Sequence, residues 1–188
     1  MKVQKNQVRI ISGKWRGRKI SFPESDGLRP TTDRIRETVF NWLMRRLPGA
    51  ICLDLFAGSG ALGFEAVSRG AGQVDMVENN QAVFTSLSEN KQQLDAANIR
   101  LHFQDALSYL KNTQRTFDIL FLDPPFRSNV LTGVFHLLSE KHCLRPGGLV
   151  YLELAIDRRI SELTGGWEIL KEKRAGNVHY LLLSAPQD

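Results

Sequence analysis

The segment Leu122-Asp-Pro-Pro-Phe126 combines an acid, two prolines and an aromatic ring directly after an apolar run. The prolines fix two φ angles and remove two backbone donors, so the turn is stiff and its carbonyl oxygens are free to accept. Asp123 supplies a carboxylate, and the Pro124 carbonyl supplies a second acceptor. Pro125 completes the turn, and Phe126 supplies an aromatic face. Two acceptors beside a stacking ring suit the exocyclic amino group of a base that has been turned out of its helix.

An amino group on a base is a poor nucleophile because its lone pair is delocalised into the ring. Acceptors on both N–H bonds turn the lone pair outward and stabilise the positive charge that develops on attack. The segment therefore predicts direct in-line transfer to such a group, although a structural turn around a buried Phe126 would use the same residues. Cysteine catalysis is not expected, because Cys52 and Cys143 lie outside any motif and fit core packing. The four histidines lack metal-ligand spacing with them, so no metal is expected.

A second motif, residues 53–63 with the sequence LDLFAGSGALG, lies where a predicted strand turns into a helix. Its glycines Gly58, Gly60 and Gly63 match the dinucleotide-binding fingerprint. Glu78 ends the next predicted strand, where a carboxylate can bind both hydroxyls of a ribose. A plain tight turn before a helix could use the same glycines. The order of strand, glycine turn, helix, strand and acid favours a nucleoside site.

Asp54 indicates which nucleoside is bound. A carboxylate at the end of the first strand would repel a pyrophosphate but would attract a cofactor that carries an ammonium and a sulfonium. The motif therefore favours S-adenosylmethionine (SAM) over NAD, the alternative being an aspartate that only bonds the turn. Asp105, just after the third strand, could accept from the adenine amino group or cap the helix that begins at Ala106.

Strands and helices alternate along the chain from Ala50 onward. Strands are expected at 51–56, 73–78, 99–103, 117–122 and 149–154, and helices at 60–69, 80–96, 106–111 and 129–141. This alternation predicts an α/β fold with a parallel sheet and helices on both faces. Residues 167–173 and 178–183 flank an Ala-Gly-Asn turn, which predicts a hairpin that adds antiparallel strands at one edge.

The N-terminal part of the chain is strongly basic. Residues 1–46 carry a net charge of +8, whereas the remaining 142 residues carry −3. Two short strands are expected at 8–12 and 18–22, followed by a helix capped by Thr32 or Asp33 whose core-facing residues are Ile35, Val39, Trp42 and Leu43. A basic segment on a mildly acidic body is typical of a polyanion-binding surface, although it could be only a solvated face.

RNA contacts are expected from one set of basic residues: Arg9, Lys14, Arg16, Arg18, Lys19 and Arg29. Trp15 could stack on an exposed base or could simply cover the small N-terminal sheet.

Length and composition exclude several classes of protein. The chain has 188 residues, of which 42% are hydrophobic and 24% charged, so it is neither a disordered tail nor a collagen-like fibre. Its two cysteines provide no disulfide framework and fit a reducing compartment. No apolar run approaches the roughly 20 residues that span a bilayer, and the N-terminus does not resemble a secretory signal. A cytoplasmic protein without membrane contact is expected.

Two motifs together carry a resemblance to a known family. Asp-Pro-Pro-Phe with Asp-x-Phe-x-Gly-Ser-Gly resembles the amino-group methyltransferases that act on adenine N6, cytosine N4 or guanine N2. The N-terminal segments 9–18 and 28–37, with Phe40-Asn41, closely resemble the RsmD family of bacterial small-subunit rRNA guanine-N2 methyltransferases. The resemblance covers nearly the whole chain.

The resemblance implies a Rossmann-like class I SAM-dependent methyltransferase with a mostly parallel seven-stranded sheet. Residues 1–30 would form a basic, RNA-binding β-extension, and residues 31–188 the methyltransferase domain. The substrate would be guanine 966 of 16S rRNA, in the small ribosomal subunit or its assembly intermediate, and the protein would be a monomer. An adenine-N6 or other amino methyltransferase, and a non-catalytic RNA-binding assembly factor, remain alternatives.

The resemblance also implies roles for individual residues. The cofactor would be bound by Thr32, Arg36, Asp54, Phe56, Gly58, Ser59, Gly60, Glu78, Asn79, Asp105 and Ala106. The target base would be bound by Asp123, Pro124, Pro125 and Phe126. Thr32 and Arg36 would close over the methionine end of the cofactor, but Arg36 could instead pair with Glu37 or Asp33 on the surface.

Overall fold

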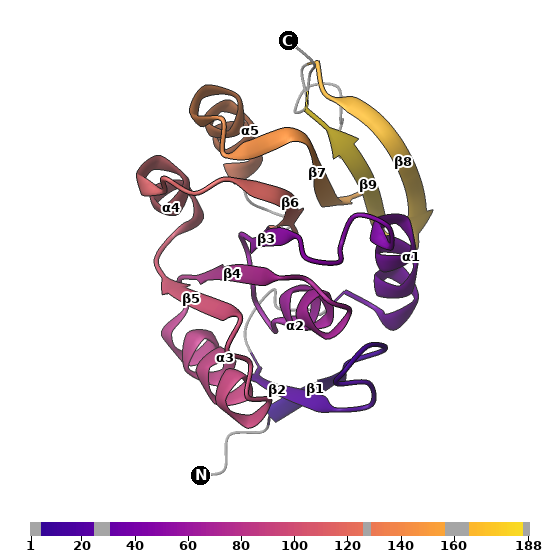
Figure 1. The fold of residues 1–188 in the computed structure, drawn as a ribbon, viewed down its shortest axis with the longest axis vertical. Helices are drawn as coiled ribbons and strands as arrows, with labels where there is room; N and C mark the ends of the chain where they lie inside the picture. Colours follow the sequence, from indigo (N-terminus) through magenta and orange to yellow (C-terminus); the bar gives the residue numbers. More distant parts are fainter. Residues whose placement is uncertain (1–4, 25–30, 126–128, 157–165, 186–188) are drawn as a thin grey trace.

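Seven strands form one sheet in the order β5-β4-β3-β6-β7-β9-β8 (Figure 1). The structure is a computed structural model that describes residues 5–24, 31–125, 129–156 and 166–185. The strands are β3 (Ile51–Asp54), β4 (Gln73–Glu78), β5 (Ile99–Phe103), β6 (Phe117–Leu122), β7 (Leu144–Ala155), β8 (Glu168–Ala175) and β9 (Val178–Ser184). Strands β3 to β7 pair in parallel, whereas β9 is antiparallel to both β7 and β8. The predicted fold class and C-terminal hairpin are confirmed.

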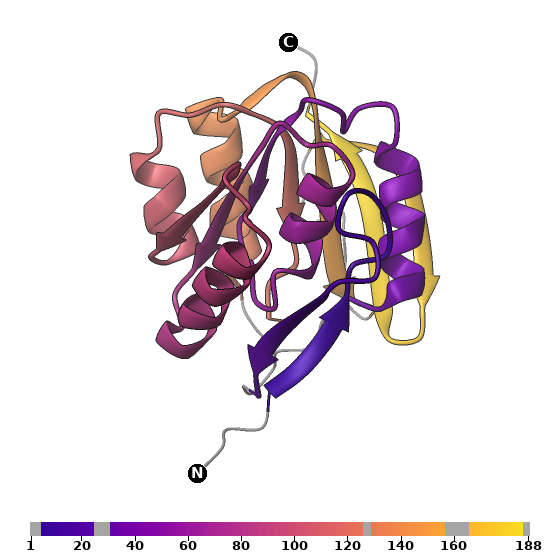
Figure 2. The ribbon, with the colours of Figure 1, turned by 60° about the horizontal axis from the view of Figure 1, so that its bottom comes forward.

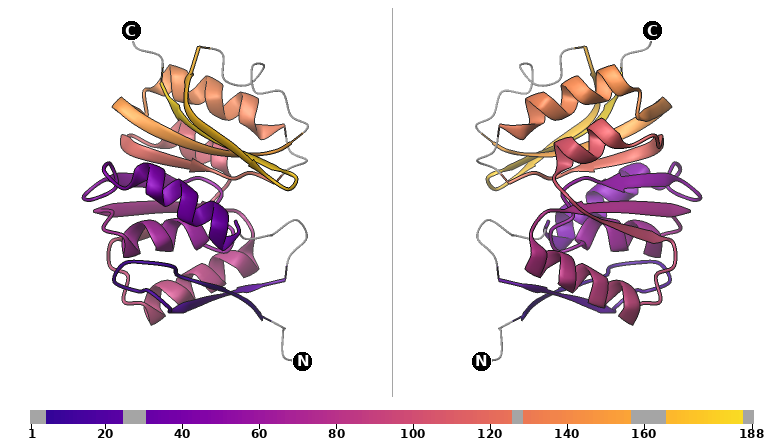
Figure 3. Two further views of the ribbon diagram at one scale, coloured as in Figure 1. Left: turned by 90° about the vertical axis from the view of Figure 1, so that its right-hand side faces the viewer. Right: turned by 90° about the vertical axis from the view of Figure 1, so that its left-hand side faces the viewer.

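Helices cover both faces of the sheet. One face packs against α1 (Asp33–Leu43), α2 (Ala61–Ser68) and α3 (Gln81–Gln93), and the other against α4 (Ala106–Asn112) and α5 (Val130–Lys141). Figure 3 shows α1 and α4 on opposite sides of the molecule. Strand β6 explains this layering, because Ile119 and Phe121 join the core on the α1 side while Leu120 and Leu122 join the core on the α5 side. An apolar run is expected of a strand that is covered on both faces.

The hairpin of β1 (Lys5–Arg9) and β2 (Lys19–Pro23) forms an outer layer beside α2 and α3 (Figure 2). Strand β1 ends earlier than the predicted range of 8–12. The reason is that the backbone N–H groups of Ile11 and Ser12 donate to the Glu65 carboxylate at 2.7 and 3.0 Å, and not to a neighbouring strand. Strand β7 also differs from its prediction, since it begins at Leu144 and not at Leu149.

The hairpin shares a hydrophobic core with the sheet domain. Its buried apolar side chains belong to the same cluster as those of α1, α2 and α3; they are Val8, Ile10, Trp15, Ile20 and Phe22. Asn90 of α3 holds the middle of β2, because its amide both donates to the Ser21 carbonyl and accepts from the Ser21 N–H. The described residues on the two sides of position 30 therefore pack as one unit.

A buried ion pair connects the hairpin, α1 and α2. Both side chains of the Arg36–Glu65 pair are fully buried, with a separation of 3.4 Å between Arg36 Nη1 and Glu65 Oε2. The Glu65 carboxylate also accepts from Arg69 Nε at 2.6 Å, in addition to Ile11 and Ser12 of the hairpin. Glu65 thus joins three segments that are distant in sequence. No helix among the described ranges is long and apolar enough to cross a membrane.

Replacing Glu65 by Ala should lower the free energy of unfolding by about 3 kcal/mol or more, because Arg36 would stay buried without this carboxylate. Chemical denaturation followed by circular dichroism measures the change. Glu37→Ala, on the exposed side of α1, is the control and should change stability by less than about 0.5 kcal/mol. Equal stability of the two variants would contradict the role assigned to Glu65.

Candidate active site

Four acidic side chains lie at or just beyond the carboxyl ends of neighbouring strands. Asp54 ends β3, Glu78 ends β4, Asp123 follows β6 and Glu153 lies near the end of β7. The carboxyl edge of an open parallel sheet is where ligands bind in such folds. The sheet order therefore brings together acids from four separate parts of the chain.

The loop between β3 and α2 requires its glycines. Gly58 and Gly60 have φ angles of +50° and +80°, and a Cβ on Gly60 would lie 2.6 Å from the Phe64 ring. A Cβ on Gly63 would lie 3.1 Å from Asp54 Oδ2, so only glycine lets the helix pack this closely on the strand. The backbone is thereby free to approach a ligand closely at the start of α2.

Glu78 is held against this loop by backbone donors. Its Oε2 accepts from the N–H of Gly58 at 3.0 Å, and its Oε1 accepts from the N–H groups of Asn79 and Asn80 at 2.9 and 2.8 Å. A carboxylate has about four acceptor positions, so acceptor capacity remains for hydroxyl groups. The half-buried Glu78 is therefore oriented and still available to a ribose.

Asp54 is a buried carboxylate with one unused oxygen. Its side chain is 1% exposed, and Oδ2 accepts from the Gly63 N–H at 3.0 Å, while Oδ1 has no hydrogen-bond partner among the described residues. Burial, followed by the negative charge of Glu78, raises the pKa of Asp54 from 3.8 to about 7. A buried anion without a cation is destabilised, so this position suits a positively charged ligand group. These residues therefore fit a cofactor that carries an ammonium and a sulfonium.

The remaining predicted cofactor residues border the same edge. Asp105 accepts from the Ser108 N–H at 3.0 Å and so caps α4, as one of its two predicted roles requires. Hydrogen bonds from the side chain and then the backbone of Ser108 lower the pKa of Asp105, which remains exposed. Ser59 lies buried in the glycine loop, where its hydroxyl accepts from the Ala61 N–H. Phe56 is half-buried, Asn79 is exposed and Ala106 is buried at the start of α4.

A hydrogen-bonded network that was not predicted from the sequence surrounds Asp123. The buried Thr31 hydroxyl lies 3.2 Å from Asp123 Oδ2 and 3.2 Å from Glu153 Oε2. The Tyr151 hydroxyl donates to the same Glu153 oxygen at 2.7 Å. Burial, followed by the charge of Glu153, raises the pKa of Asp123 well above its ordinary value. An acid inside the apolar stretch of β7 was the available sequence signal for Glu153.

The predicted target-base residues are partly described. Asp123 is partly exposed, Pro124 is buried and Pro125 is exposed, with no cis peptide bond among the described residues. Phe126, like Arg29 of the basic set, lies outside the described residues.

Thr32 and Arg36 have structural roles in α1. Thr32 caps the helix by accepting from the Ile35 N–H at 3.4 Å. The fully buried guanidinium of Arg36 donates to Asp33 Oδ1 at 2.6 Å and to the Arg9 carbonyl at 2.8 Å, in addition to its pair with Glu65. This corrects the predicted role of Arg36 over the cofactor, since protein groups occupy its guanidinium. The alternative pairing with Asp33 is observed, with the Arg36 side chain buried and the Asp33 side chain exposed.

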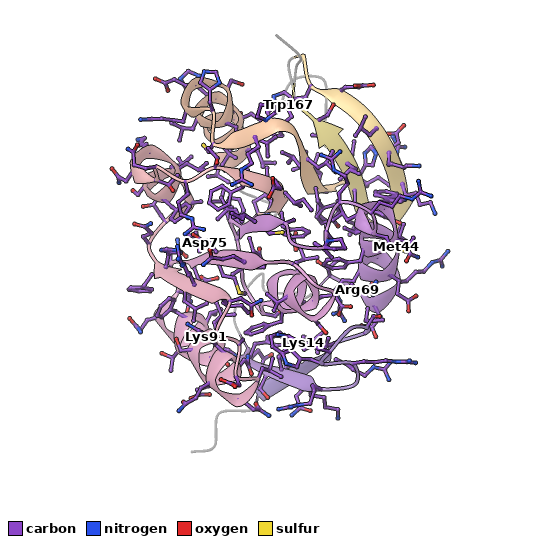
Figure 4. All side chains as sticks on the ribbon, in the orientation of Figure 1. Lys14, Met44, Arg69, Asp75, Lys91 and Trp167 are labelled. Atoms are coloured by element: carbon purple, nitrogen blue, oxygen red, sulfur yellow. The ribbon has the colours of Figure 1, made fainter. Side chains whose placement is uncertain are left out.

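The basic residues of the hairpin are exposed. Their set is Arg9, Lys14, Arg16, Arg18 and Lys19. Lys14 lies away from the acidic edge, whereas Arg9 pairs with Asp33 at the start of α1, with 3.7 Å between Arg9 Nη2 and Asp33 Oδ2. The turn that carries Lys14 bonds to Ser68 at the C-terminal end of α2, whereas the glycine loop lies at the N-terminal end of that helix. Figure 4 labels Lys14 on the hairpin and Arg69 after α2.

Trp15 is buried, which supports the second of its two predicted roles. The indole is only 7% exposed and packs edge-on against Phe64 of α2, with ring centroids 6.4 Å apart. The Lys14 ammonium lies 4.3 Å from the indole centroid. A ring covered in this way cannot stack on an exposed base, so the predicted RNA contact of Trp15 is corrected to a core contact.

The two cysteines, Cys52 and Cys143, are buried and free. Within the described ranges, no three His, Cys, Asp or Glu side chains are grouped so that they could hold a metal ion.

The chain is similar to known proteins over almost its full length. A family model described as Conserved hypothetical protein 95 matches residues 8–184. Ribosomal RNA small subunit methyltransferase D of Escherichia coli strain K12 is 44% identical over 176 residues, covering 94% of this chain and 89% of that protein. The Haemophilus influenzae protein of the same name is 44% identical over 182 residues, covering 95% and 94%. The solved structure of Escherichia coli yhhF has a TM-score of 0.89 and 41% identity, and covers 96% of this chain and 99% of that one. Sequence motifs, fold and relatives agree, and the chain belongs to the RsmD family.

Proposed function

We propose that this protein transfers the methyl group of SAM to the exocyclic N2 of one guanine, guanine 966, in the 16S rRNA of the small ribosomal subunit or its assembly intermediate. Its relatives at 44% identity are named as small-subunit rRNA methyltransferases, and the protein is a SAM-dependent rRNA methyltransferase. The choice of guanine N2 rests on the RsmD resemblance. An rRNA substrate favours a cytoplasmic location, and a monomer is the simplest assembly.

One observation carries the proposal: the Asp123 carboxylate and the unpartnered Asp54 oxygen lie at the ends of two directly paired strands. Strand β3 pairs with β6, and the Cα partner of Asp54 is Phe121, two residues before Asp123. One edge of the sheet thus offers an acceptor for an amino group beside an acceptor for a cation. A positively charged methyl donor and a base amino group need these two acceptors close together.

Each residue has a distinct task in this proposal. SAM, when bound, supplies a methyl group activated by the sulfonium. Asp54 attracts its positive charge, Glu78 accepts from the ribose hydroxyls, and the exposed carboxylate of Asp105 accepts from the adenine amino group. Asp123 and the Pro124 carbonyl accept the two N–H bonds of the target amino group. That contact becomes stronger as positive charge develops on the nitrogen, so it favours the transition state over the ground state.

The exposed basic residues of the hairpin would contact RNA that lies away from the target base. The turn that carries Lys14 is separated from the glycine loop by the length of α2, which is eight residues or about 12 Å. The rRNA would therefore extend over the side of the protein that carries the hairpin.

Replacing Asp123 by Ala should reduce rRNA methylation by about 100-fold or more, because the amino group loses its charged acceptor. SAM affinity, measured by calorimetry, should stay within about twofold, and Asp95→Asn on the surface is the matched control. The reaction is followed with tritiated SAM, and the expected labelled product in rRNA digests is N2-methylguanosine. Unaltered modification by the Asp123→Ala variant would contradict catalysis at this residue, and labelled N6-methyladenosine would contradict the choice of base.

SAM binding should tighten as pH rises, because only ionised Asp54 attracts its positive charge. With a pKa of about 7 for Asp54, the affinity should be about tenfold weaker at pH 6 than at pH 8. The raised pKa also affects the stability of the unliganded protein. Protonated Asp54 contributes to the free energy of unfolding, and this contribution is fully present below the ordinary pKa of 3.8 and is lost as pH rises through about 7. The Asp54→Asn variant should bind SAM weakly, and its SAM affinity should not rise between pH 6 and pH 8. If the SAM affinity of Asp54→Asn rises with pH as in the wild type, a group other than Asp54 titrates.

Replacing Arg16 and Arg18 together by Ala should weaken RNA binding and reduce the slope of log K against log salt by roughly one to two units, with SAM affinity unchanged. The matched control removes two lysines, Lys111 and Lys141, from α4 and α5 on the opposite face of the sheet. Fluorescence anisotropy with rRNA at several salt concentrations measures both slopes. If both double variants give the wild-type slope, the hairpin surface does not bind RNA.

A further inference from the structure

Glu153 is a second buried carboxylate behind the target-base corner. Strand β7 pairs in parallel with β6, and Leu152 is the Cα partner of Leu122, so Glu153 lies next to Asp123 on the neighbouring strand. Glu153 is only 4% exposed, whereas Asp123 is partly exposed. A carboxylate in this position would be costly unless something balanced its charge.

The hydrogen bonds between Thr31 and the two carboxyl groups depend on how many hydrogen atoms the three groups carry. Ionised carboxylates only accept hydrogen bonds, and the Thr31 hydroxyl has a single hydrogen to donate. That hydroxyl nevertheless lies 3.2 Å from an oxygen of Asp123 and 3.2 Å from an oxygen of Glu153. Each contact can be a separate two-centre hydrogen bond only if one of the two carboxyl groups carries a proton and donates it to Thr31 Oγ1.

The surrounding charges support a shared proton. Other titratable groups that face the pair are Asp54 at the end of β3, Tyr151 on β7 and Tyr180, the β9 neighbour of Glu153. Neither carboxylate forms an ion pair with a described residue, so no described cation balances their negative charge. Burial raises the pKa of both carboxyl groups, and the charge of Glu153 raises that of Asp123 further.

The exposure of the two side chains favours Glu153 as the holder of the proton. Asp123 is partly exposed and so is the better solvated place for the negative charge, whereas Glu153 is 4% exposed. Protonated Glu153 would then donate to Thr31 Oγ1, and the Thr31 hydroxyl would donate to Asp123 Oδ2, across the two 3.2 Å contacts. This arrangement fixes the Asp123 carboxylate and leaves Oδ1 available to an incoming amino group.

We propose that Glu153 is a positioning residue for methyl transfer, which shares one proton with Asp123 through Thr31 and thereby holds Asp123 as an ionised, oriented acceptor. The inference rests on the proposed function for its catalytic meaning. As the N–CH₃ bond forms and the S–CH₃ bond breaks, one N–H bond of the target nitrogen breaks and its proton moves to Asp123. The proton leaves Asp123 for water when the product departs.

The shared proton can be observed without any substrate. In protein labelled with ¹³C at the glutamate side-chain carboxyl carbon, the signal that is absent from Glu153→Gln belongs to Glu153. That signal should titrate above the ordinary glutamate pKa of 4.5, and its midpoint should fall in Asp123→Asn, where the neighbouring charge is removed. Titration near 4.5 in the wild-type protein would overturn the proposal.

Activity gives an independent readout. At alkaline pH the shared proton is lost, and the Thr31 hydroxyl can then donate to only one of two carboxylates that repel each other. The rate of methylation by the wild-type protein should therefore decline at alkaline pH. Glu153→Gln carries a permanent donor to Thr31 Oγ1, so this alkaline decline should be absent in that variant. Thr31→Val should lower kcat, and Thr31→Ser should restore it relative to Thr31→Val. Identical pH profiles for Glu153→Gln and the wild type would overturn the positioning role.

The two measurements also separate this inference from the proposed function. If the Glu153 signal titrates as expected but no variant or wild-type protein methylates rRNA, the shared proton stands and the proposed reaction fails.

Discussion

Parallel pairing of β3, β4, β6 and β7 concentrates negative charge at one edge of the sheet. Asp54 and Glu153 are buried there, Asp123 is partly exposed, and Glu78 is tied to the glycine loop. Like charges in a poorly solvated place repel, and each must be balanced by a proton or a cation. SAM brings positive charge to this edge, and positive charge also develops on the target nitrogen during transfer. The electrostatic strain of the unliganded edge is therefore relieved by the groups that react.

The rest of the fold keeps this edge rigid. Thr31, which immediately precedes α1, binds both carboxylates of the target corner, and the start of α1 is connected through Arg36 to Glu65 of α2. Glu65 in turn holds the backbone of the N-terminal hairpin. The basic hairpin and the acidic edge thus belong to one packed structure, and RNA bound on the hairpin would be held in a fixed relation to the methyl-transfer corner.

The parts of this structure that depend on local pattern were predictable from the sequence. Apolar runs flanked by turn residues identified the strands of the central sheet, and Asp54, Glu78 and Asp123 were found because each ends or follows such a run. Contacts between distant segments were not predictable. Glu153 lies beside Asp123 only because β7 pairs with β6 in one register, and Thr31 reaches both only because α1 packs beside them. The sequence likewise left the roles of Arg36 and Trp15 open between a ligand and the protein itself, because their contacts with Glu65 and Phe64 form only in the folded chain.

The most direct measurement of the central claim is a crystal structure of the protein with S-adenosylhomocysteine and an rRNA fragment that contains the target guanine. The guanine N2 should lie within hydrogen-bonding distance of Asp123 and the Pro124 carbonyl, with the sulfur facing N2 across the space of one methyl group. A sulfur atom far from the Asp-Pro-Pro corner, or a corner that admits no purine edge, would contradict this claim.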